Sequence, residues 1–375
     1  MLKRLPWPGM IALVLVSLFV AGCGDQRIIE RLGFTQTVSL DLANEDEESK
    51  LFIVGATIPK ADPEGKIERE VISAEARSLK EGFLKHTRTT ELRLVGGQIR
   101  NTMYGISVAK KGIWDHVHDL IRDPAISGNV KITIVNGRAI DLLSKDFPEN
   151  PRTGQYVDRL LEKESKGLAI PRVTIHDFAR DYYDDGIDPV APVVKMVKDQ
   201  VQLDGIALFQ DDRYIAKISD QQGLYFSLLY GRVKGGLLNL EIGGNESEDM
   251  ESILLNSVTS SRKIKVNRLD ERDLSVQIEI KARGSLLGYT GELDLSDEQD
   301  RRKLTVLIEE AITKEAETIV KTMQQHQTDS IGIGQYVRNS MSYSEWKELD
   351  WREAFAELNV RIDTKFEIND YGNVN

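Results

Sequence analysis

Alternating apolar and polar positions near the N-terminus predict a β-hairpin. The first strand has an apolar side and a polar side, formed respectively by Val38, Leu40 and Leu42 and by Thr37, Ser39 and Asp41. A second strand is predicted at residues 51–58. The charged residues 44–50 between them are typical of a solvated turn.

Helical periodicity follows the predicted hairpin. Apolar residues recur at helical spacing in residues 73–86 and 106–121, and short strand candidates lie at residues 91–95 and 130–135. Strands that alternate with helices predict a mixed α/β N-terminal domain.

The regular periodicity becomes weaker in the middle of the chain. A helix is predicted around residues 156–161, after Pro148 and Pro151. Residues 169–198 contain three prolines and the acidic stretch 181–188, so we expect them to be irregular. We therefore place a domain boundary near Lys198.

Period-2 alternation dominates the second half, after a predicted strand at 202–209 and a short helix at 224–230. Alternating segments occur at residues 238–242, 263–267, 274–281 and 358–368, and the middle two should pair as an antiparallel hairpin. A long helix with an apolar stripe runs from a capping box at Ser296 to about His326. The apolar sheet face and the helix stripe must bury each other.

These elements predict an α+β fold: a mixed α/β N-terminal domain at residues 23–198, then an antiparallel sheet packed against a long helix at residues 199–375. A further division of the second domain near residue 235 stays open.

Residues 1–22 have the three parts of a secretory signal: a basic start at Lys3 and Arg4, a short apolar run, and small residues before Cys23. A Cys directly after Ala21 and Gly22 resembles the lipobox of bacterial lipoproteins. The alternative is an uncleaved membrane helix with an incidental Cys, but the apolar run is well short of the roughly 20 residues that span a bilayer. Cys23 is thus the predicted lipidation site.

Charge restricts the partners of the protein. The net charge of the sequence is −11, and removal of residues 1–22 with Lys3 and Arg4 takes it to −13. This balance argues against nucleic-acid binding and against electrostatic adhesion of the body to anionic lipid. Two acyl chains give stable anchoring where one does not. Because Cys23 is the only cysteine, neither a disulfide nor a Cys-based metal site is expected.

Two acidic clusters are metal candidates. Asp115, His118 and Asp119 share one face of a predicted helix at a spacing that can hold a divalent cation, although an ordinary polar helix face explains them as well. A second set loosely resembles a calcium loop but lacks the alternate-residue ligand order. Its members are Asp181, Asp184, Asp185 and Asp188. We favour the structural interpretation for both and expect no metal and no cofactor.

No sequence motif indicates catalysis. The chain has no G-x-S-x-G, Walker A or zincin motif. Gly332 and Gly334 are a weak phosphate-loop signal because no strand precedes them. Trp346 and Trp351 could form an aromatic ligand platform, but packing against the sheet is the favoured interpretation. We therefore expect a protein without enzymatic activity.

Four features together resemble the Ger(x)C family, the C subunits of nutrient germinant receptors in spore-forming Bacillus-type bacteria. Cys23 is followed by Asp25, Arg27, Ile29 and Leu32-Gly33, with Gly24 where Trp is commoner in the family. The other three features are the 205–209 segment with Lys217, the Gly- and Leu-rich residues 231–242, and the Trp346, Trp351, Phe355 run before residues 360–362. The resemblance spans nearly the whole chain.

The resemblance implies a lipid-anchored subunit on the outer surface of the inner spore membrane. It would act with integral-membrane A and B subunits in a receptor that triggers germination in response to amino acids, sugars or nucleosides. Cys23 is the only functional residue carried over. The alternatives are a solute-binding lipoprotein that captures the nutrient itself, and an envelope hydrolase. The period-2 second half argues against the two parallel-sheet lobes of solute-binding proteins, and no nucleophile, base or metal set supports a hydrolase.

Overall fold

The structure is a computed structural model that describes residues 31–44, 50–61, 67–147, 149–150, 152–167, 169–243, 250–270 and 273–372. Cys23 and the predicted signal segment 1–22 lie outside these residues. The same is true of residues 45–49 in the predicted first turn.

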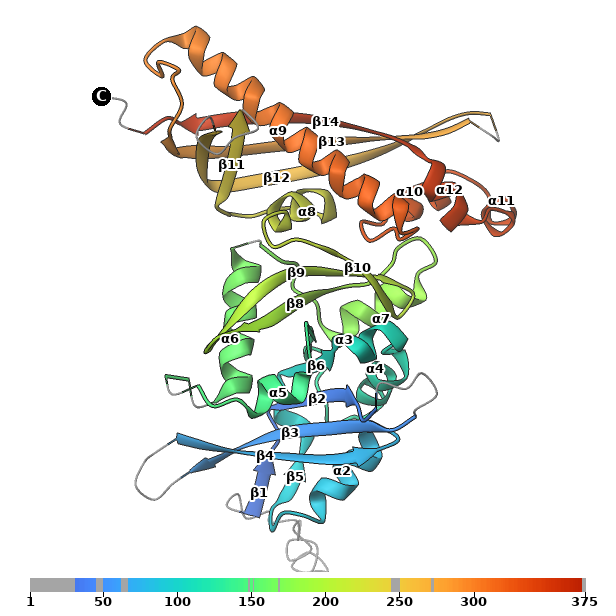
Figure 1. Cartoon of the computed structure of the whole chain (residues 1–375). Coiled ribbons are helices and arrows are strands. Elements are labelled where there is room, and N and C mark those ends of the chain that lie inside the picture. The colour runs from blue at the N-terminus through green and yellow to red at the C-terminus, as the bar shows by residue number, and fades with distance from the viewer. Residues whose placement is uncertain are drawn as a thin grey trace, which may run out of the picture.

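An eight-stranded mixed sheet forms the centre of the N-terminal part (Figure 1). Its order is β10(Arg213–Ile218), β9(Gln200–Gln210), β8(Val190–Val197), β7(Lys131–Val135), β6(Asn101–Gly105), β2(Thr37–Leu42), β3(Phe52–Ala61), β4(Ile67–Ala76). The four strands from β8 to β2 run parallel to one another, and antiparallel strands flank them on both sides. The predicted hairpin is confirmed, with Leu40 opposite Val54.

Strand β2 is buried on both faces because other elements cover both sides of the sheet at this position. On the sheet face that carries Leu40, α2(Leu79–Thr87) packs on the neighbouring strand β3, where Gly82 lies directly on Val54. The other face is covered by α5(Ala139–Ser144) and α6(Thr153–Lys166). Other helices of this part are α3(Ile106–Lys111), α4(Trp114–Ile121) and α7(Ile175–Tyr183), whereas α8(Gly223–Tyr230) follows β10 and contacts elements of the C-terminal part (Figure 1).

The polar side of β2 therefore has a structural role. The Asp41 carboxylate, 2% exposed, accepts the backbone N–H groups of Ala139 and Ile140, each at 2.7 Å. These groups lie in the first turn of α5, which has no side-chain cap of its own. Asp41 thus stabilises this helix end from a neighbouring strand. Burial raises the pKa of Asp41, and the two hydrogen bonds act in the opposite direction.

A four-stranded sheet and a long helix form the C-terminal part. The sheet order is β11(Leu238–Gly243), β12(Met250–Asp270), β13(Asp273–Tyr289), β14(Asn359–Asp370). The predicted antiparallel hairpin between β12 and β13 is confirmed by Ile264 opposite Ile278. The last strand is different, because β14 runs parallel to β13 and not antiparallel as the prediction of an antiparallel sheet required. A crossover through a helix brings the chain back in the same direction. Apolar alternation in the sequence gives no information about strand direction.

Helix α9(Glu298–Gln325) crosses this sheet (Figure 1). Its predicted apolar stripe is buried, including Leu304, Ile308 and Ile319. The N-cap is Asp297, which accepts the N–H groups of Gln299 and Asp300, so the predicted capping box at Ser296 is wrong. The α+β class itself is confirmed.

Three other local predictions are wrong. Residues 73–76 belong to β4, and α2 begins only at Leu79, with Ser78 as its N-cap. The segment 106–121 forms two helices because Gly112 has φ +119° between them. Residues 169–198, expected to be irregular, contain α7 and β8. Pro171 lies before α7, Pro189 directly precedes β8, and Pro192 lies within β8 opposite Ile206.

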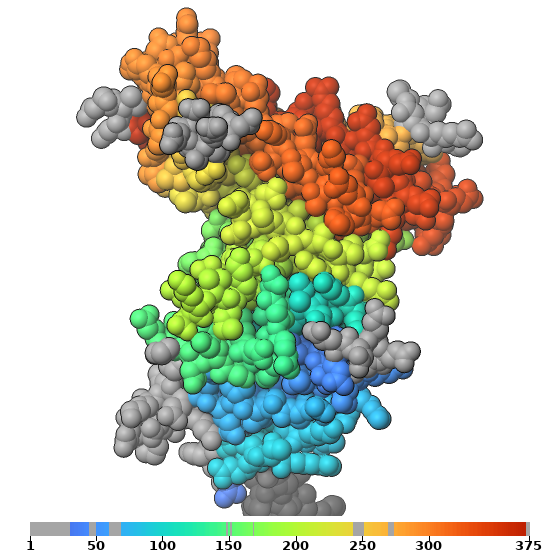
Figure 2. Space-filling view, viewed as in Figure 1, coloured from blue at the N-terminus to red at the C-terminus, as the bar shows by residue number. Residues whose placement is uncertain are grey.

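The elements follow one another along the molecule from the N-terminal strands to α9 and β14 (Figure 2). The boundary proposed at Lys198 falls in the turn between β8 and β9, which pair in one sheet. The sheet continues to Ile218, and the four-stranded sheet begins at Leu238. The division into domains at residue 198 or near 235 stays a prediction.

We predict that Gly154→Ala destabilises the N-terminal part. The new Cβ would lie 2.0 Å from Thr37 Oγ1 and 2.8 Å from Thr37 Cβ, and the short Thr37 side chain cannot move out of the sheet interior. Overpacking of this kind lowers the free energy of unfolding by about 1–3 kcal/mol, which urea denaturation would measure. The matched control is Gly128→Ala, whose Cβ would be 3.7 Å from the nearest atom, His176 Cβ. Equal stability of the two variants would contradict this packing.

Candidate functional site: the acidic junction

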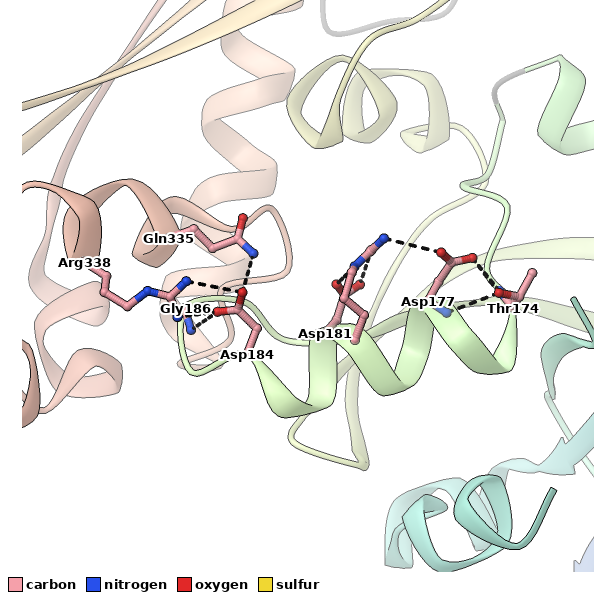
Figure 3. A network of polar contacts seen from close by, with 8 residues as sticks. Thr174, Asp177, Asp181, Asp184, Gly186, Gln335 and Arg338 are labelled. Carbon is pink, nitrogen blue, oxygen red and sulfur yellow. Dashed lines mark hydrogen bonds and ion pairs between the residues drawn. The ribbon is translucent and has the colours of Figure 1, made fainter. Parts of the chain in front are cut away.

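The acidic residues 181–188 lie between the two sheets, against three short helices that follow α9. These helices are α10(Ile333–Asn339), α11(Tyr343–Glu348) and α12(Trp351–Glu357). Figure 3 shows α7 leading into this segment, with Asp184 pointing toward Gln335 and Arg338 of α10. We call this contact region the acidic junction.

Helix α7 positions the acidic junction. It begins with a capping box in which the Thr174 hydroxyl accepts the Asp177 N–H and the Asp177 carboxylate accepts the Thr174 N–H (Figure 3). Near its end, the Arg180 guanidinium donates two hydrogen bonds to Asp181, at 2.8 and 3.1 Å. Asp181 is 2% exposed, and burial raises its pKa while Arg180 acts to lower it.

Asp184 binds side chains of α10, on the C-terminal side of the acidic junction. Its carboxylate accepts hydrogen bonds from Arg338 Nη1 at 2.7 Å and from Gln335 Nε2 at 2.9 Å, besides the Gly186 N–H at 2.9 Å (Figure 3). Burial acts to raise the pKa of Asp184, but these hydrogen bonds outweigh it and lower the pKa below its ordinary value. The carboxylate is therefore ionised and paired at neutral pH.

Asp185 binds three groups of α10 and α11. Its carboxylate accepts hydrogen bonds from the Trp346 indole Nε1 at 3.1 Å, Lys347 Nζ at 3.1 Å and Arg338 Nη1 at 2.8 Å. Burial opposes ionisation, yet these donors lower the pKa of Asp185 to about 2. The indole of Trp346 is thus an anchor at the junction, where we had expected it to pack against the sheet.

Asp188 and Asp329 make the deepest contact across the junction. The Asp188 N–H donates to the Asp329 carbonyl and the Asp329 N–H donates to the Asp188 carboxylate, each at 2.9 Å. The Asp329 carboxylate, in turn, accepts the Ile333 and Gly334 N–H groups and so caps the first turn of α10. Burial raises the pKa of Asp188 and raises that of Asp329 to about 7.

Two glycines allow the backbones to approach each other at this point. The Gly186 carbonyl accepts the Gln335 N–H at 3.1 Å. A Cβ on Gly186 would lie 2.6 Å from Gln335 N, and a Cβ on Gly334 would lie 2.5 Å from Trp351 Nε1. Gly334 and Gly332, considered above as a weak phosphate-loop signal, therefore serve packing and the start of α10.

A cavity of about 380 Å³ opens beside the acidic junction. Aromatic rings and charged groups line it, among them Tyr182, Tyr183, Trp351, Asp211 and Arg352. The charges are already paired within the protein, since Arg352 binds Asp211 at 2.6 Å and Asp188 at 3.4 Å. This arrangement joins two parts of the chain and provides no nucleophile with an adjacent base.

The structure does not assemble the predicted metal candidates into a site. Among the described residues, no group of three or more His, Cys, Asp or Glu side chains is arranged to hold a metal ion. Asp119 forms an ion pair with Lys80 at 3.4 Å, and the His118 ring lies against Trp114. The four aspartates from Asp181 to Asp188 each bind protein donors instead of converging on one point.

Sequence reasoning identified the aspartates but missed their partners. Arg338, Gln335 and Lys347 lie about 150 residues downstream in sequence, on short helices with ordinary composition. Gly186 inside the acidic stretch was a usable signal, because a glycine among aspartates can mark a close backbone approach.

We predict that Asp185→Asn weakens the acidic junction in a pH-dependent way. Because the folded-state pKa is lowered from 3.8 to about 2, its stabilisation is present above pH 3.8 and is lost as the pH falls from there toward 2. The side chain is half exposed, so solvent screening reduces the effect to about 1 kcal/mol at pH 7. Urea denaturation from pH 3 to 7 would measure the difference from wild type. The exposed Asp220→Asn is the control, and a pH-independent difference would contradict the pairing.

Comparison with known proteins places both parts of the chain in one family. Residues 25–196 match the family model of the spore germination protein N-terminal domain, and residues 204–372 match the model described as spore germination B3/GerAC like, C-terminal. The chain is 22% identical over 362 residues to spore germination protein GerQC of Bacillus cereus, covering 96% of this chain and 98% of the relative. It is 19% identical over 374 residues to spore germination protein B3 of Bacillus subtilis (strain 168), covering 95% and 96%.

A solved structure supports the same fold. The chain resembles the crystal structure of the GerBC protein with a TM-score of 0.58 and 15% sequence identity, over 88% of this chain and 96% of that chain. No helix in the described part of the chain is long and apolar enough to cross a membrane. The two matched models together span residues 25 to 372 with a short gap, and the chain belongs to the Ger(x)C (GerAC) family of spore germination proteins, the germinant receptor C subunits.

Proposed function

We propose that this protein is the lipid-anchored subunit of a spore nutrient germinant receptor, is needed for the germination response, and acts with integral-membrane A and B subunits. It would lie on the outer surface of the inner spore membrane, attached through a diacylglyceryl group on Cys23. The observation that carries the proposal is the match of both parts of the chain to germination-protein models. The lipobox-like residues before Cys23 support the anchor.

We infer a role through protein contacts, without catalysis. The ionised side chains of the acidic junction are engaged with one another, as in the Asp184–Arg338 and Asp211–Arg352 pairs. Paired charges of this kind fix the relative position of two parts of a protein and leave few free groups for substrate chemistry. A rigid extracytoplasmic body suits a subunit that contacts membrane partners.

One observation favours a second candidate function, nutrient capture. A cavity of about 940 Å³ lies between α8, β11 and α9, and its size falls within the range of small-molecule sites. Tyr225, Glu241, Lys314 and Glu315 give it aromatic and charged walls. A solute-binding lipoprotein would use such a cavity for an amino acid, a sugar or a nucleoside.

Cys23→Ala tests the anchor. We expect the signal to remain uncleaved or the body to be released from the membrane, with germination weakened and the fold unchanged. Fractionation of spore membranes, circular dichroism and a germination assay would measure these three properties. Mass spectrometry of the wild-type mature N-terminus should find a diacylglyceryl group on Cys23.

The control for this change is Ser17→Ala, within the apolar run but away from the cleavage position. It should leave membrane association and germination intact. Normal fractionation and germination of Cys23→Ala, or a bare thiol on mature material, would refute the anchor.

A titration separates the two candidate functions. We expect that the purified body binds amino acids, sugars and nucleosides no more tightly than millimolar, as measured by calorimetry. Co-purification with the A and B subunits from spores should succeed. Saturable micromolar binding that Ala311→Trp abolishes, by filling the cavity beside α9, would favour nutrient capture instead.

A further inference from the structure

The end of the molecule farthest from the C-terminal sheet is formed by β1, β5 and the residues just before β5 (Figure 1). Strands β1(Leu32–Phe34) and β5(Arg93–Val95) pair in parallel, with Leu32 opposite Arg93. Arg31 and Arg93 are therefore neighbours at the start of this small sheet. Arg88 caps the C-terminal end of α2 in the segment that leads into β5.

This end differs in charge from the rest of the protein. Residues 77–100 contain six Arg or Lys residues and only two acidic ones, although the whole chain carries −11. Arg31, Arg88 and Arg93 are exposed, and none of them forms an ion pair with another described residue. Lys85, by contrast, is paired with Glu81. Within residues 77–100, Glu91 is the exposed acid, and Glu75 just before them is exposed as well.

An exposed apolar side chain accompanies these arginines. Leu84, on the last turns of α2, is 55% exposed although large apolar residues of this part are mostly buried. Cations with an exposed apolar residue are the combination by which proteins lie at a lipid interface. We call the end of the molecule that carries Arg31, Leu84, Arg88 and Arg93 the basic end.

The chain also leads from the basic end to the expected anchor. Seven residues lie between Cys23 and Arg31, and the eight steps from one to the other reach at most roughly 28 Å. A lipid on Cys23 would therefore keep the basic end within reach of the headgroups, whatever conformation the connecting residues adopt.

We propose that the basic end rests on an anionic phospholipid surface and orients the tethered body, with the C-terminal sheet directed away from the membrane. This inference rests on the proposed lipid anchor. The net negative charge of the rest of the body opposes adhesion of other faces to the same surface. Anchor and charge thus have separate functions: the acyl chains hold the protein, and the arginines select which end faces the lipid.

The strength of the orientational preference follows from the number of arginines that form no ion pair with another described residue. Each basic residue close to an anionic leaflet strengthens its attraction roughly fivefold. Three arginines opposed by Glu91 would then favour the proposed orientation by about 20- to 100-fold over orientations that present acidic faces. Salt should weaken this preference because the charges are exposed.

The experiment uses the chain from Cys23 to its C-terminus, coupled through this single thiol to a maleimide lipid in preformed vesicles. The vesicles contain phosphatidylcholine with phosphatidylglycerol, and brominated acyl chains quench any tryptophan at the interface. Leu84→Trp reports on the basic end, and Leu287→Trp, replacing a residue 60% exposed on β13, is the matched reporter on the C-terminal sheet. The unsubstituted chain supplies the signal of the native tryptophans.

We expect strong quenching at position 84 and little at position 287. Replacement of Arg31, Arg88 and Arg93 by Glu should abolish the difference without changing the circular dichroism spectrum, and high salt or pure phosphatidylcholine should reduce it. Equal quenching at both positions, or quenching unchanged by the triple replacement, would overturn the proposal. So would a triple variant that keeps its orientation on lipid but loses co-purification with the membrane subunits, because the arginines would then serve a protein partner.

This test is separate from the test of the proposed function. Maleimide coupling supplies the tether, so the orientation is measured whether or not Cys23 carries a lipid in spores. A bare Cys23 in native material would refute the anchor alone, and absence of a preferred orientation on vesicles would refute the basic end alone.

Discussion

The reciprocal contact between Asp188 and Asp329 is the constraint on which the arrangement of the two sheets depends. Each residue donates its backbone N–H to the other, and the carboxylate of Asp329 also holds the first turn of α10. Buried carboxylates are costly unless hydrogen bonds compensate for the lost water. A small slide between the two parts would leave these groups unsatisfied, and each buried donor or acceptor left without a partner costs about 1–3 kcal/mol. The junction therefore has one favoured position, and the outer pairs of Asp184 and Asp185 reinforce it.

Where the apolar pattern is set by a single buried face, the sequence is a good guide to this fold. The stripe of α9 and the β12–β13 hairpin were predictable because an apolar face must be covered and a one-residue shift would expose it. The pattern failed for β2, because Thr37, Ser39 and Asp41 look like a solvent face but lie beneath α5 and α6. It failed again for β14, since periodicity carries no information about strand direction. Both failures involve partners that are distant in sequence.

The candidate site shows the same limit more strongly. The four aspartates between 181 and 188 are visible in the sequence as a charge cluster, and their number invites a metal interpretation. Their actual ligands are Arg338, Gln335, Lys347 and backbone N–H groups that approach only when the chain is folded. A carboxylate cluster in sequence has no fixed meaning, because ion pairing, helix capping and metal binding all use the same side chain. The positions of its partners distinguish these roles.

Net charge alone likewise does not predict how the protein would lie on a membrane surface. A body of −13 argues against electrostatic adhesion, and that argument holds for the molecule as a whole. Screening, however, limits each exposed charge to about 8–10 Å in physiological salt, so a surface responds to the nearest side chains and hardly to the total. A tethered protein can bring only one end that close to the headgroups, and here that end carries Arg31, Arg88 and Arg93. The acidic remainder then strengthens the preference, because every other orientation would place carboxylates against an anionic surface. In the proposed arrangement, anchoring through Cys23 would turn a charge asymmetry that is too weak to bind the free protein into one that is sufficient to orient it.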